Sequence, residues 1–396
     1  MTHTFTSRLF FAVNALAGVG LNIGVVGVGW FIIDVTGSNQ LLGVYGSVSL
    51  LTAFITLALA GAVMDKYSKL TLLRFCCLGQ AVIFFLTALG TYFHLPVRAL
   101  IYGLAVLNMP LMVLFSVVSR GAVAAIWDRA SLTRGNSVLE ITLQIGAMCA
   151  AVLTGILYQF CGFSWLMALA GVLCLAAGGL LVKWPILENA SKTVAASFWQ
   201  ELYTGWHYLV QHKKALLYGF VAFIPTIIIS VSNTVIPGYV EQSLGKASIT
   251  YGVGDMWFAV GALLAGIIGT RWERLHARFL GFLFGGVTLC LGILQAGRNV
   301  FLFYGMVFLL GLGLAQLRIL LNTLFMKKMD PNFLGRSLSL LMAFSMILQA
   351  FLSYGVGAWM DRHGAASGFV WLLCLALLGL ILLGLANGVR RIARTL

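Results

Sequence analysis

The stretch "GAVMDKYSKLTLLR", Gly61–Arg74, decides the fold. It carries four charged residues, Asp65, Lys66, Lys69 and Arg74, at the junction of two long apolar runs, residues 40–64 and 70–93. Each run is long enough to cross the hydrocarbon core of a bilayer as a helix, which takes about 20 residues. A compact group of charges between two such runs is typical of a short turn that lies in water outside the membrane and joins two transmembrane helices.

The whole chain repeats this pattern. Of its 396 residues, 61% are hydrophobic and only 9% are charged, with a mean hydropathy of +0.99. Soluble domains carry about 25% charged residues. Unbroken apolar runs exclude the alternating pattern of a membrane barrel. In lipid, only helices and closed barrels satisfy the backbone, so the sequence predicts an all-α membrane protein.

Twelve spans are expected, which places both termini on the same side of the membrane. They are 8–33, 40–64, 70–93, 98–126, 134–159, 164–184, 214–240, 248–270, 279–297, 299–326, 335–359 and 367–388. The first run continues to Ile33, too long for the apolar core of a signal peptide. With the termini inside, nineteen basic residues fall in inner segments and four in outer loops. The positive-inside rule therefore predicts that both termini are cytoplasmic.

The chain is expected to form two six-helix halves, residues 1–184 and 214–396, joined by a cytoplasmic linker, 185–213. Apolar and polar residues of the linker stretch 198–212 fall on opposite faces of a helix, which suits either an interfacial helix or a helix docked on the bundle.

The two halves also share motifs. Gly61-x3-Asp65 recurs as Gly269-x3-Glu273, and the spacing of Asp128 and Arg134 recurs in Asp330 and Arg336. Two similar halves are an architecture used for alternating access.

At this point the sequence resembles a known family. In "GAVMDKYSK", Gly61, Asp65, Lys66, Ser68 and Lys69 match the G-x3-D-[RK]-x-[GS]-[RK] signature of the major facilitator superfamily. The stretches "DVTGSNQLLGVYGSV", "DRASLTRGNSVLE", "FWQELYTGWHYLVQHKKAL" and "MDPNFLGRSLSL" resemble its macrolide-efflux branch. The likeness covers nearly the full length.

The resemblance implies that the opening cluster is a gate. Asp65 would face the N-terminus of helix eleven, where a carboxylate is favoured, and basic residues would complete a charge network while the cytoplasmic side is closed. The residues assigned to this gate are Gly61, Asp65, Lys66, Lys69, Arg74, Arg120, Asp128, Glu273 and Arg336. A plain positive-inside loop is the alternative.

Four charged residues fall inside predicted spans and away from the span ends, where each is costly unless it is paired or faces water. Arg120 and Glu140 lie at similar depths on spans four and five and are expected to pair, as a structural or gating ion pair or as a protonation site. Asp255 has no basic residue placed at its depth, so it is either the proton-coupling carboxylate or a rim carboxylate. Arg318 suits a carboxylate or phosphate ligand; its alternatives are Glu140 or carbonyl groups at a helix end.

Polar side chains on the spans that the superfamily places around its central site predict a cavity for an amphipathic organic ligand. They are Asn14, Asn22, Asn108, Gln144, Asn233, Asn322 and Gln349. Buried amides also join helices to one another, so each of them has that alternative role.

Several kinds of function are excluded or disfavoured. The chain has no G-x4-GK[ST] loop for ATP and no nucleophile elbow or H-E-x-x-H motif, so we expect no enzyme and no cofactor. Its seven cysteines lack metal-type spacing and none of its six histidines falls mid-span, so no metal site is expected. The net charge of +14 is spread over alternate connections, which argues against nucleic acid.

The residues and the resemblance together predict a monomeric secondary transporter of a bacterial inner membrane that moves a small amphipathic organic compound, either neutral or anionic, in exchange for protons. Export as the direction is implied by the resemblance alone. Import of an anionic metabolite or metal chelate through Arg318 is the first alternative. A non-transporting membrane receptor or lipid-binding protein with the same fold is the second.

Overall fold

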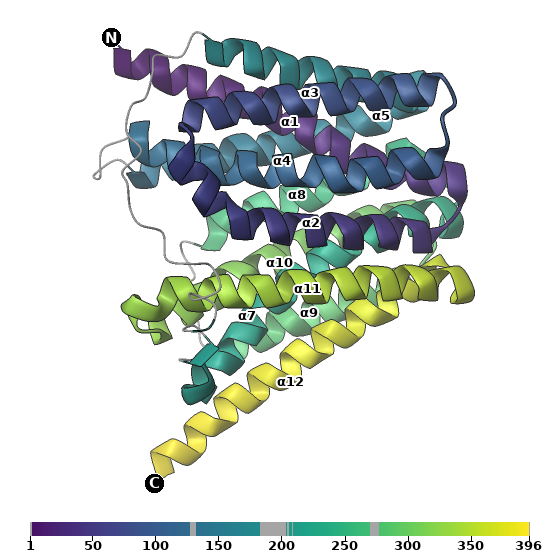
Figure 1. Ribbon diagram of the computed structural model, residues 1–396. Helices are drawn as coiled ribbons and strands as arrows, with labels where there is room; N and C mark the ends of the chain where they lie inside the picture. Colours follow the sequence, from purple (N-terminus) through teal and green to yellow (C-terminus); the bar gives the residue numbers. More distant parts are fainter. Residues whose placement is uncertain are drawn as a thin grey trace. The chain divides into compact units, whose positions relative to one another are not determined.

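The computed structural model describes residues 2–126, 132–182, 203, 206, 207, 209–269 and 277–395, and these are helical apart from short turns (Figure 1). The helices are α1 (Thr2–Thr36), α2 (Asn39–Lys66), α3 (Lys69–Tyr92), α4 (Val97–Ile126), α5 (Leu132–Val182), α7 (Lys213–Gly238), α8 (Ser248–Gly269), α9 (Ala277–Ala296), α10 (Val300–Lys328), α11 (Pro331–His363) and α12 (Gly368–Thr395). Two short turns accompany them, the π-helix η1 (Tyr239–Ser243) and the 3-10 helix η2 (Ala365–Ser367). No strand occurs in the part of the chain that is described.

Eleven of these helices are long and apolar enough to cross a membrane. One of them, Gly135–Val182, is 48 residues long and breaks at Gly162, whose φ of 80° and ψ of 174° are not helical. Its two arms correspond to predicted spans five and six. The expected all-α fold with twelve membrane-spanning segments is therefore confirmed, and hydropathy placed the ends of the spans to within a few residues.

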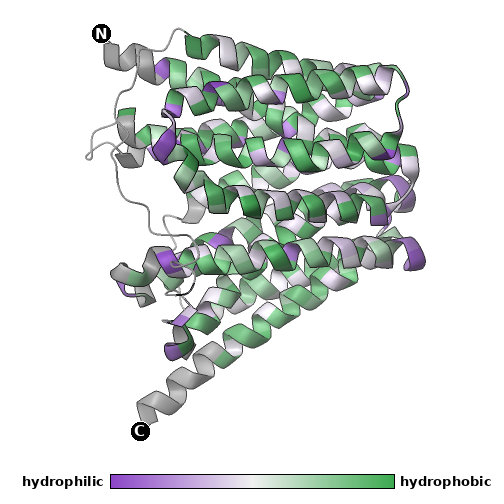
Figure 2. Ribbon diagram, viewed as in Figure 1, coloured by the Kyte–Doolittle hydropathy of each residue, from purple (hydrophilic) through white to green (hydrophobic). Residues whose placement is uncertain are grey.

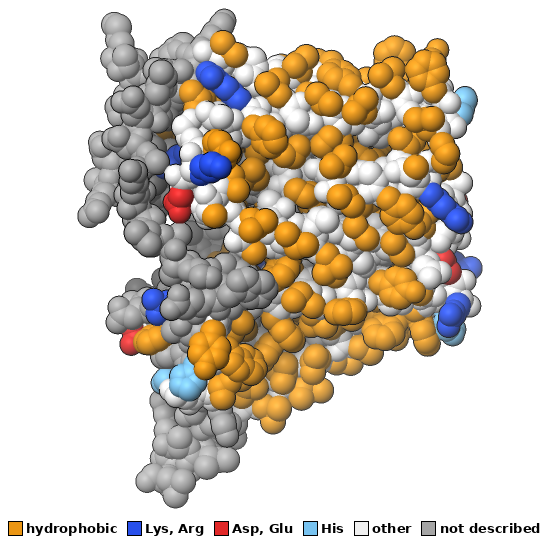
Figure 3. Space-filling view, viewed as in Figure 1, with side chains coloured by type: hydrophobic (Ala, Val, Ile, Leu, Met, Phe, Trp, Pro, Cys, Tyr) orange, Lys and Arg blue, Asp and Glu red, His pale blue; other side chains and the backbone are white. Residues whose placement is uncertain are grey.

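Hydrophobic residues follow the lengths of the helices, whereas strongly hydrophilic residues gather at the described helix ends (Figure 2). On the face shown in Figure 3, hydrophobic side chains cover most of the described surface between these ends. Large apolar side chains are exposed along the spans; Phe282 and Phe351, for example, are 75% and 73% exposed. A soluble protein rarely leaves so much apolar surface in water. These surfaces are those expected to face lipid.

Contacts divide the chain into two compact units. The first comprises Met1–Thr36, Val48–Ala195 and Ala247–Met256, and the second Gly37–Ser47, Ala196–Lys246 and Trp257–Leu396. In the first unit α1 and α3 pack against α5, and in the second α7 packs against α10, α11 and α12. Helix α2 is divided between the units, with its residues up to Ser47 in the second unit and those from Val48 in the first. Helix α8 is divided as well, with its residues up to Met256 in the first unit and those from Trp257 in the second.

Most of the linker 185–213 lies outside the described residues. In its described part, Tyr203 and Trp206 are exposed and Leu209 is buried. This pattern suits both an interfacial helix and a docked one, so the role of the linker stays a prediction.

Candidate functional site

The turn after α2 is stabilised by a helix cap at the start of α3. Ser68 precedes α3 in an extended conformation, and its hydroxyl accepts a hydrogen bond from the Thr71 N–H, which caps the helix. Asp65 and Lys66, just before this cap, are exposed, and no hydrogen bond or ion pair joins Asp65 to a described residue. A Cβ on Gly61 would meet nothing within 4 Å. The turn is thus accessible in this conformation.

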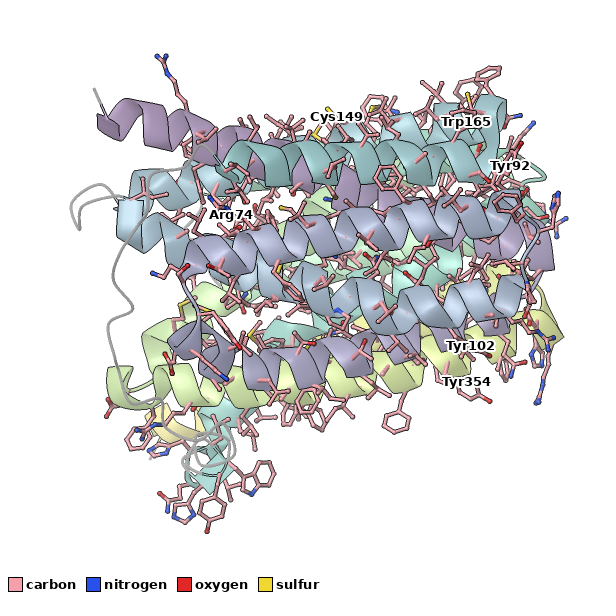
Figure 4. All side chains as sticks on the ribbon, turned by 45° about the horizontal axis from the view of Figure 1, so that its top comes forward. Arg74, Tyr92, Tyr102, Cys149, Trp165 and Tyr354 are labelled. Carbon is pink, nitrogen blue, oxygen red and sulfur yellow. The ribbon has the colours of Figure 1, made fainter. Side chains whose placement is uncertain are left out.

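The basic residues after the turn bind backbone rather than carboxylates. The Lys69 ammonium donates to the Gly121 carbonyl of α4 at 3.0 Å. Arg74, at one end of α3 (Figure 4), donates from Nε and Nη2 to the Leu181 carbonyl at the end of α5, at 3.2 and 2.7 Å. Cations at the C-terminal ends of helices compensate unpaired carbonyl groups. In this conformation Lys69 and Arg74 therefore hold helices of the first unit together, and neither is paired with Asp65.

The predicted ion pair is present. Arg120 Nη1 on α4 lies 2.6 Å from Glu140 Oε1 on α5. The side chains are 56% and 55% exposed, so the pair is open to its surroundings rather than enclosed in the bundle. Because Glu140 pairs with Arg120, it is not the partner of Arg318, which was one of the alternatives for that arginine.

Asp255 lies in the segment of α8 that belongs to the first unit. It is half-buried, and none of the described Lys or Arg side chains forms an ion pair with it. One helical turn earlier, Tyr251 stacks on Trp30 of α1 with ring centroids 5.7 Å apart. The carboxylate thus lies one helical turn from an aromatic pair, and it has no basic partner among the described residues.

Arg318 lies in the span Val300–Met326 of α10. Its side chain is exposed, and it forms no hydrogen bond or ion pair with any residue that the structure describes. Two residues earlier, Gln316 is 2% exposed, and both its side-chain polar atoms lack a partner among the described residues. An unpaired guanidinium within a membrane span requires water or an anion.

The predicted cavity residues divide into two groups. Asn14, Asn22 and Gln349 donate to neighbours on their own helices, namely Phe10 O, Gly18 O and Ser345 Oγ. Asn14 and Asn108 are buried. These hydrogen bonds favour structural roles for Asn14, Asn22 and Gln349, whereas the buried Oδ1 atoms of Asn14 and Asn108 have no partner among the described residues.

The second group is accessible. Gln144 and Asn322 are half-buried, and Asn233 is exposed. A ligand-binding role for these three side chains stays a prediction. Among the gate residues, Arg336 is exposed, whereas Asp128 and Glu273 lie outside the described residues.

Sequence reasoning missed a polar cluster at the start of α2. Asp361, near the end of α11, accepts hydrogen bonds from the backbone N–H groups of Asn39 and Gln40 at 2.7 and 3.1 Å. It also accepts from Ser38 Oγ at 2.9 Å and Asn39 Nδ2 at 3.0 Å. The only sequence signal was the polar run "TGSNQ" facing a charged helix end, and it does not reveal a partner more than 320 residues away.

The family model described as Major Facilitator Superfamily matches residues 9–347. A staphyloferrin A transporter of Staphylococcus aureus is 22% identical over 353 residues, which is 85% of each chain.

Solved structures show the same fold. A nucleoside transporter superposes with a TM-score of 0.76 at 13% identity, covering 96% of this chain and 99% of that one. A D-xylose-proton symporter gives 0.71 at 14% identity, covering 95% and 96%. At such identities these neighbours establish the fold and not the substrate.

Proposed function

Because this chain belongs to the Major Facilitator Superfamily, we propose that it is a secondary active transporter that exports a small amphipathic organic anion in exchange for protons. Transport across a membrane is the function that the family and the fold support. The substrate class, the direction and the coupling ion are the proposal, and each rests on a separate argument.

The observation that carries the substrate class is the free guanidinium of Arg318. A cation within a span is costly unless a counter-charge or water compensates it. No described carboxylate pairs with Arg318. Arginine presents a planar fork of donors that matches a carboxylate or phosphate. A substrate that carries such a group, with an apolar body suited to aromatic and aliphatic walls, fits this environment.

Proton coupling is assigned to Asp255 first and to Glu140 second. Coupling requires that proton and substrate bind in mutually exclusive states, with affinities that differ between those states by a few kcal/mol. Asp255 lacks a basic partner, whereas Glu140 already pairs with Arg120. A carboxylate with no ion pair to break gains and loses a proton with the smaller rearrangement.

Export is proposed from the resemblance to the macrolide-efflux branch. The second candidate function is import of an anionic metabolite or metal chelate, again through Arg318. The relative named as a staphyloferrin A transporter favours staphyloferrin A as the first compound to test. In both export and import, Arg318 would be the cation that binds the anionic substrate.

The experiment is flux in proteoliposomes with an imposed pH gradient, with staphyloferrin A and a panel of amphipathic carboxylates and phosphates as probes. We expect gradient-driven flux of an anionic probe, lost in Arg318→Gln. The matched control is Arg98→Gln, which removes an exposed arginine near the start of α4. If Arg318→Gln transports anions with unchanged affinity, the substrate class is wrong. If no compound moves in either direction, a receptor or lipid-binding role replaces transport.

A further inference from the structure

Two buried amides inside the first unit have oxygen atoms without hydrogen-bond partners. Gln80 on α3 is 1% exposed and Asn108 on α4 is 2% exposed. Gln80 Oε1 and Asn108 Oδ1 are enclosed, and neither accepts a hydrogen bond from any residue that the structure describes. Such an oxygen loses its hydration on folding and gains nothing in return. Most buried polar atoms in native proteins are satisfied, either by the protein or by ordered water.

The two amides are neighbours. Gln80 Nε2 donates a hydrogen bond to the backbone carbonyl of Asn108 at 2.9 Å. This bond fixes the orientation of the Gln80 amide, because the opposite orientation would place one oxygen against another. Oε1 is bonded to the same carbon atom as Nε2, so it also lies close to Asn108. Both unpaired oxygens therefore belong to one place, where α3 lies against α4.

A third helix and an aromatic ring close this place. A Cβ on Gly24 of α1 would overlap the ring of Phe84, and it would lie 3.6 Å from Asn108 Nδ2. Phe84 follows Gln80 by one helical turn, on the same face of α3, and is 0% exposed. Helices α1, α3 and α4 all belong to the first unit. The amides and the ring are therefore enclosed within a single unit.

Helix α4 has a freed backbone carbonyl at the same level. Pro110, two residues after Asn108, lies inside the helix. Because proline has no N–H, the carbonyl of Val106, four residues earlier, lacks its helical donor. Membrane helices tolerate proline where neighbouring side chains or ordered water satisfy the freed groups. This part of α4 therefore has several acceptors and too few donors.

We propose that Gln80 and Asn108 form a binding site for an internal water molecule between α3 and α4. The unpaired atoms are both acceptors, so the occupant has to be a donor, and water has two O–H groups for the two oxygens. Buried waters occupy polar sites that offer two to four partners. A hard metal cation is a poorer match, because it takes about six or more oxygen ligands, usually with carboxylates among them. The site gives Asn108 a structural role, and it does not depend on what the protein transports.

The test is radiolytic footprinting of the full-length protein in lipid nanodiscs, without any substrate. X-rays convert water into hydroxyl radicals, which label the nearest side chains, so a buried ring is labelled when a water molecule lies beside it. Phe84 is the reporter. Phe284 on α9 is the matched control, because it is also 0% exposed and its ring also packs on a glycine, Gly379 of α12. No buried side chain described on α9 or α12 has an unpaired polar atom.

We expect label on Phe84 and only background label on Phe284. Gln80→Met and Asn108→Leu each remove one of the two acceptors with little change in volume. Each variant should therefore lose the label on Phe84, down to the level of Phe284.

Thr87→Val is the control variant on α3. The Thr87 side chain is also buried, but its hydroxyl already donates to the Ile83 carbonyl of its own helix at 2.8 Å. Thr87→Val should therefore keep the label on Phe84. Loss of the label in this variant as well would overturn the proposal, because the label would then report general packing and not the two amides.

Two further results would contradict the proposal. If Phe84 carries no more label than Phe284 in the parent protein, no water lies beside the amides; this is the result expected if Asn108 Nδ2 donates directly to Gln80 Oε1. If the label persists in both Gln80→Met and Asn108→Leu, the water is held by other groups. The comparison of the two rings uses the parent protein, so it decides the question even if a variant fails to fold.

Discussion

Arg74 shows how a single cation can serve structure in a protein with few charges. Its two donors converge on one acceptor, the Leu181 carbonyl, and the side chain is half-buried. A lysine cannot reproduce this fork, because its ammonium is a point charge. Arg74 is one of the predicted gate residues, yet in this conformation it stabilises the junction of α3 and α5.

Arg74→Lys should lower the stability of the protein by about 1–3 kcal/mol, since a charged hydrogen bond to a buried carbonyl is lost. Thermal unfolding in detergent measures this change. Lys66→Gln is the control, because Lys66 is exposed on the preceding turn. Equal unfolding temperatures for Arg74→Lys and the parent would show that the paired hydrogen bonds contribute nothing.

For the Arg120–Glu140 ion pair we expect the opposite result, a substitution with little effect on stability. Both side chains are more than half exposed, and ion pairs open to solvent contribute about 0–1 kcal/mol. Glu140→Gln should therefore leave stability within about 1 kcal/mol of the parent. A double-mutant cycle with Arg120→Gln measures the coupling directly. A coupling energy well above this range would mean that the pair is shielded and structural.

At the scale of the helix, glycines on α8 have different neighbours. A Cβ on Gly252 would overlap the Ala151 carbonyl and the backbone of Gly155 on α5, whereas one on Gly266 would meet nothing within 4 Å. Replacing glycine by alanine therefore tests close packing at Gly252 and helix propensity at Gly266, within the same helix.

Gly252→Ala should destabilise the protein by about 1–3 kcal/mol, the usual cost of overpacking. Gly266→Ala should be neutral or stabilising by up to about 1 kcal/mol, because alanine is the better helix former. Unfolding temperatures of the two variants measured side by side check the difference. If both variants behave alike, the close contact between α5 and α8 is absent in solution.

For the whole molecule, much of the architecture was predictable because the bilayer imposes a length and a polarity on every span. Hydropathy located the helices, and counting residues along spans four and five predicted the Arg120–Glu140 pair. The exchange of Gly37–Ser47 and Ala247–Met256 between units was not predictable, because it depends on how helices pack in a particular conformation. The hydrogen bonds between Asp361 and the start of α2 were missed for the same reason, because the sequence shows Asp361 only as a charge near a helix end.

The coupling assignment is a prediction for the complete transport cycle. Asp255→Asn should abolish flux driven by a pH gradient and should also impair exchange of labelled for unlabelled substrate, because a permanently neutral side chain imitates the protonated state, which excludes the substrate. Proteoliposome assays measure both modes. If Asp255→Asn keeps gradient-driven flux and Glu140→Gln loses it, the order of the two carboxylates is reversed.

The break at Gly162 has a consequence for assembly. A single residue with φ of 80° reverses the chain between the two arms of α5, so no spare residues separate them. During synthesis the second arm cannot wait in the aqueous phase after the first has entered lipid, and the two should insert as one hairpin. Once inserted, neither arm can slide along the other without unwinding a helical turn next to Gly162. The two arms should therefore tilt together in the membrane.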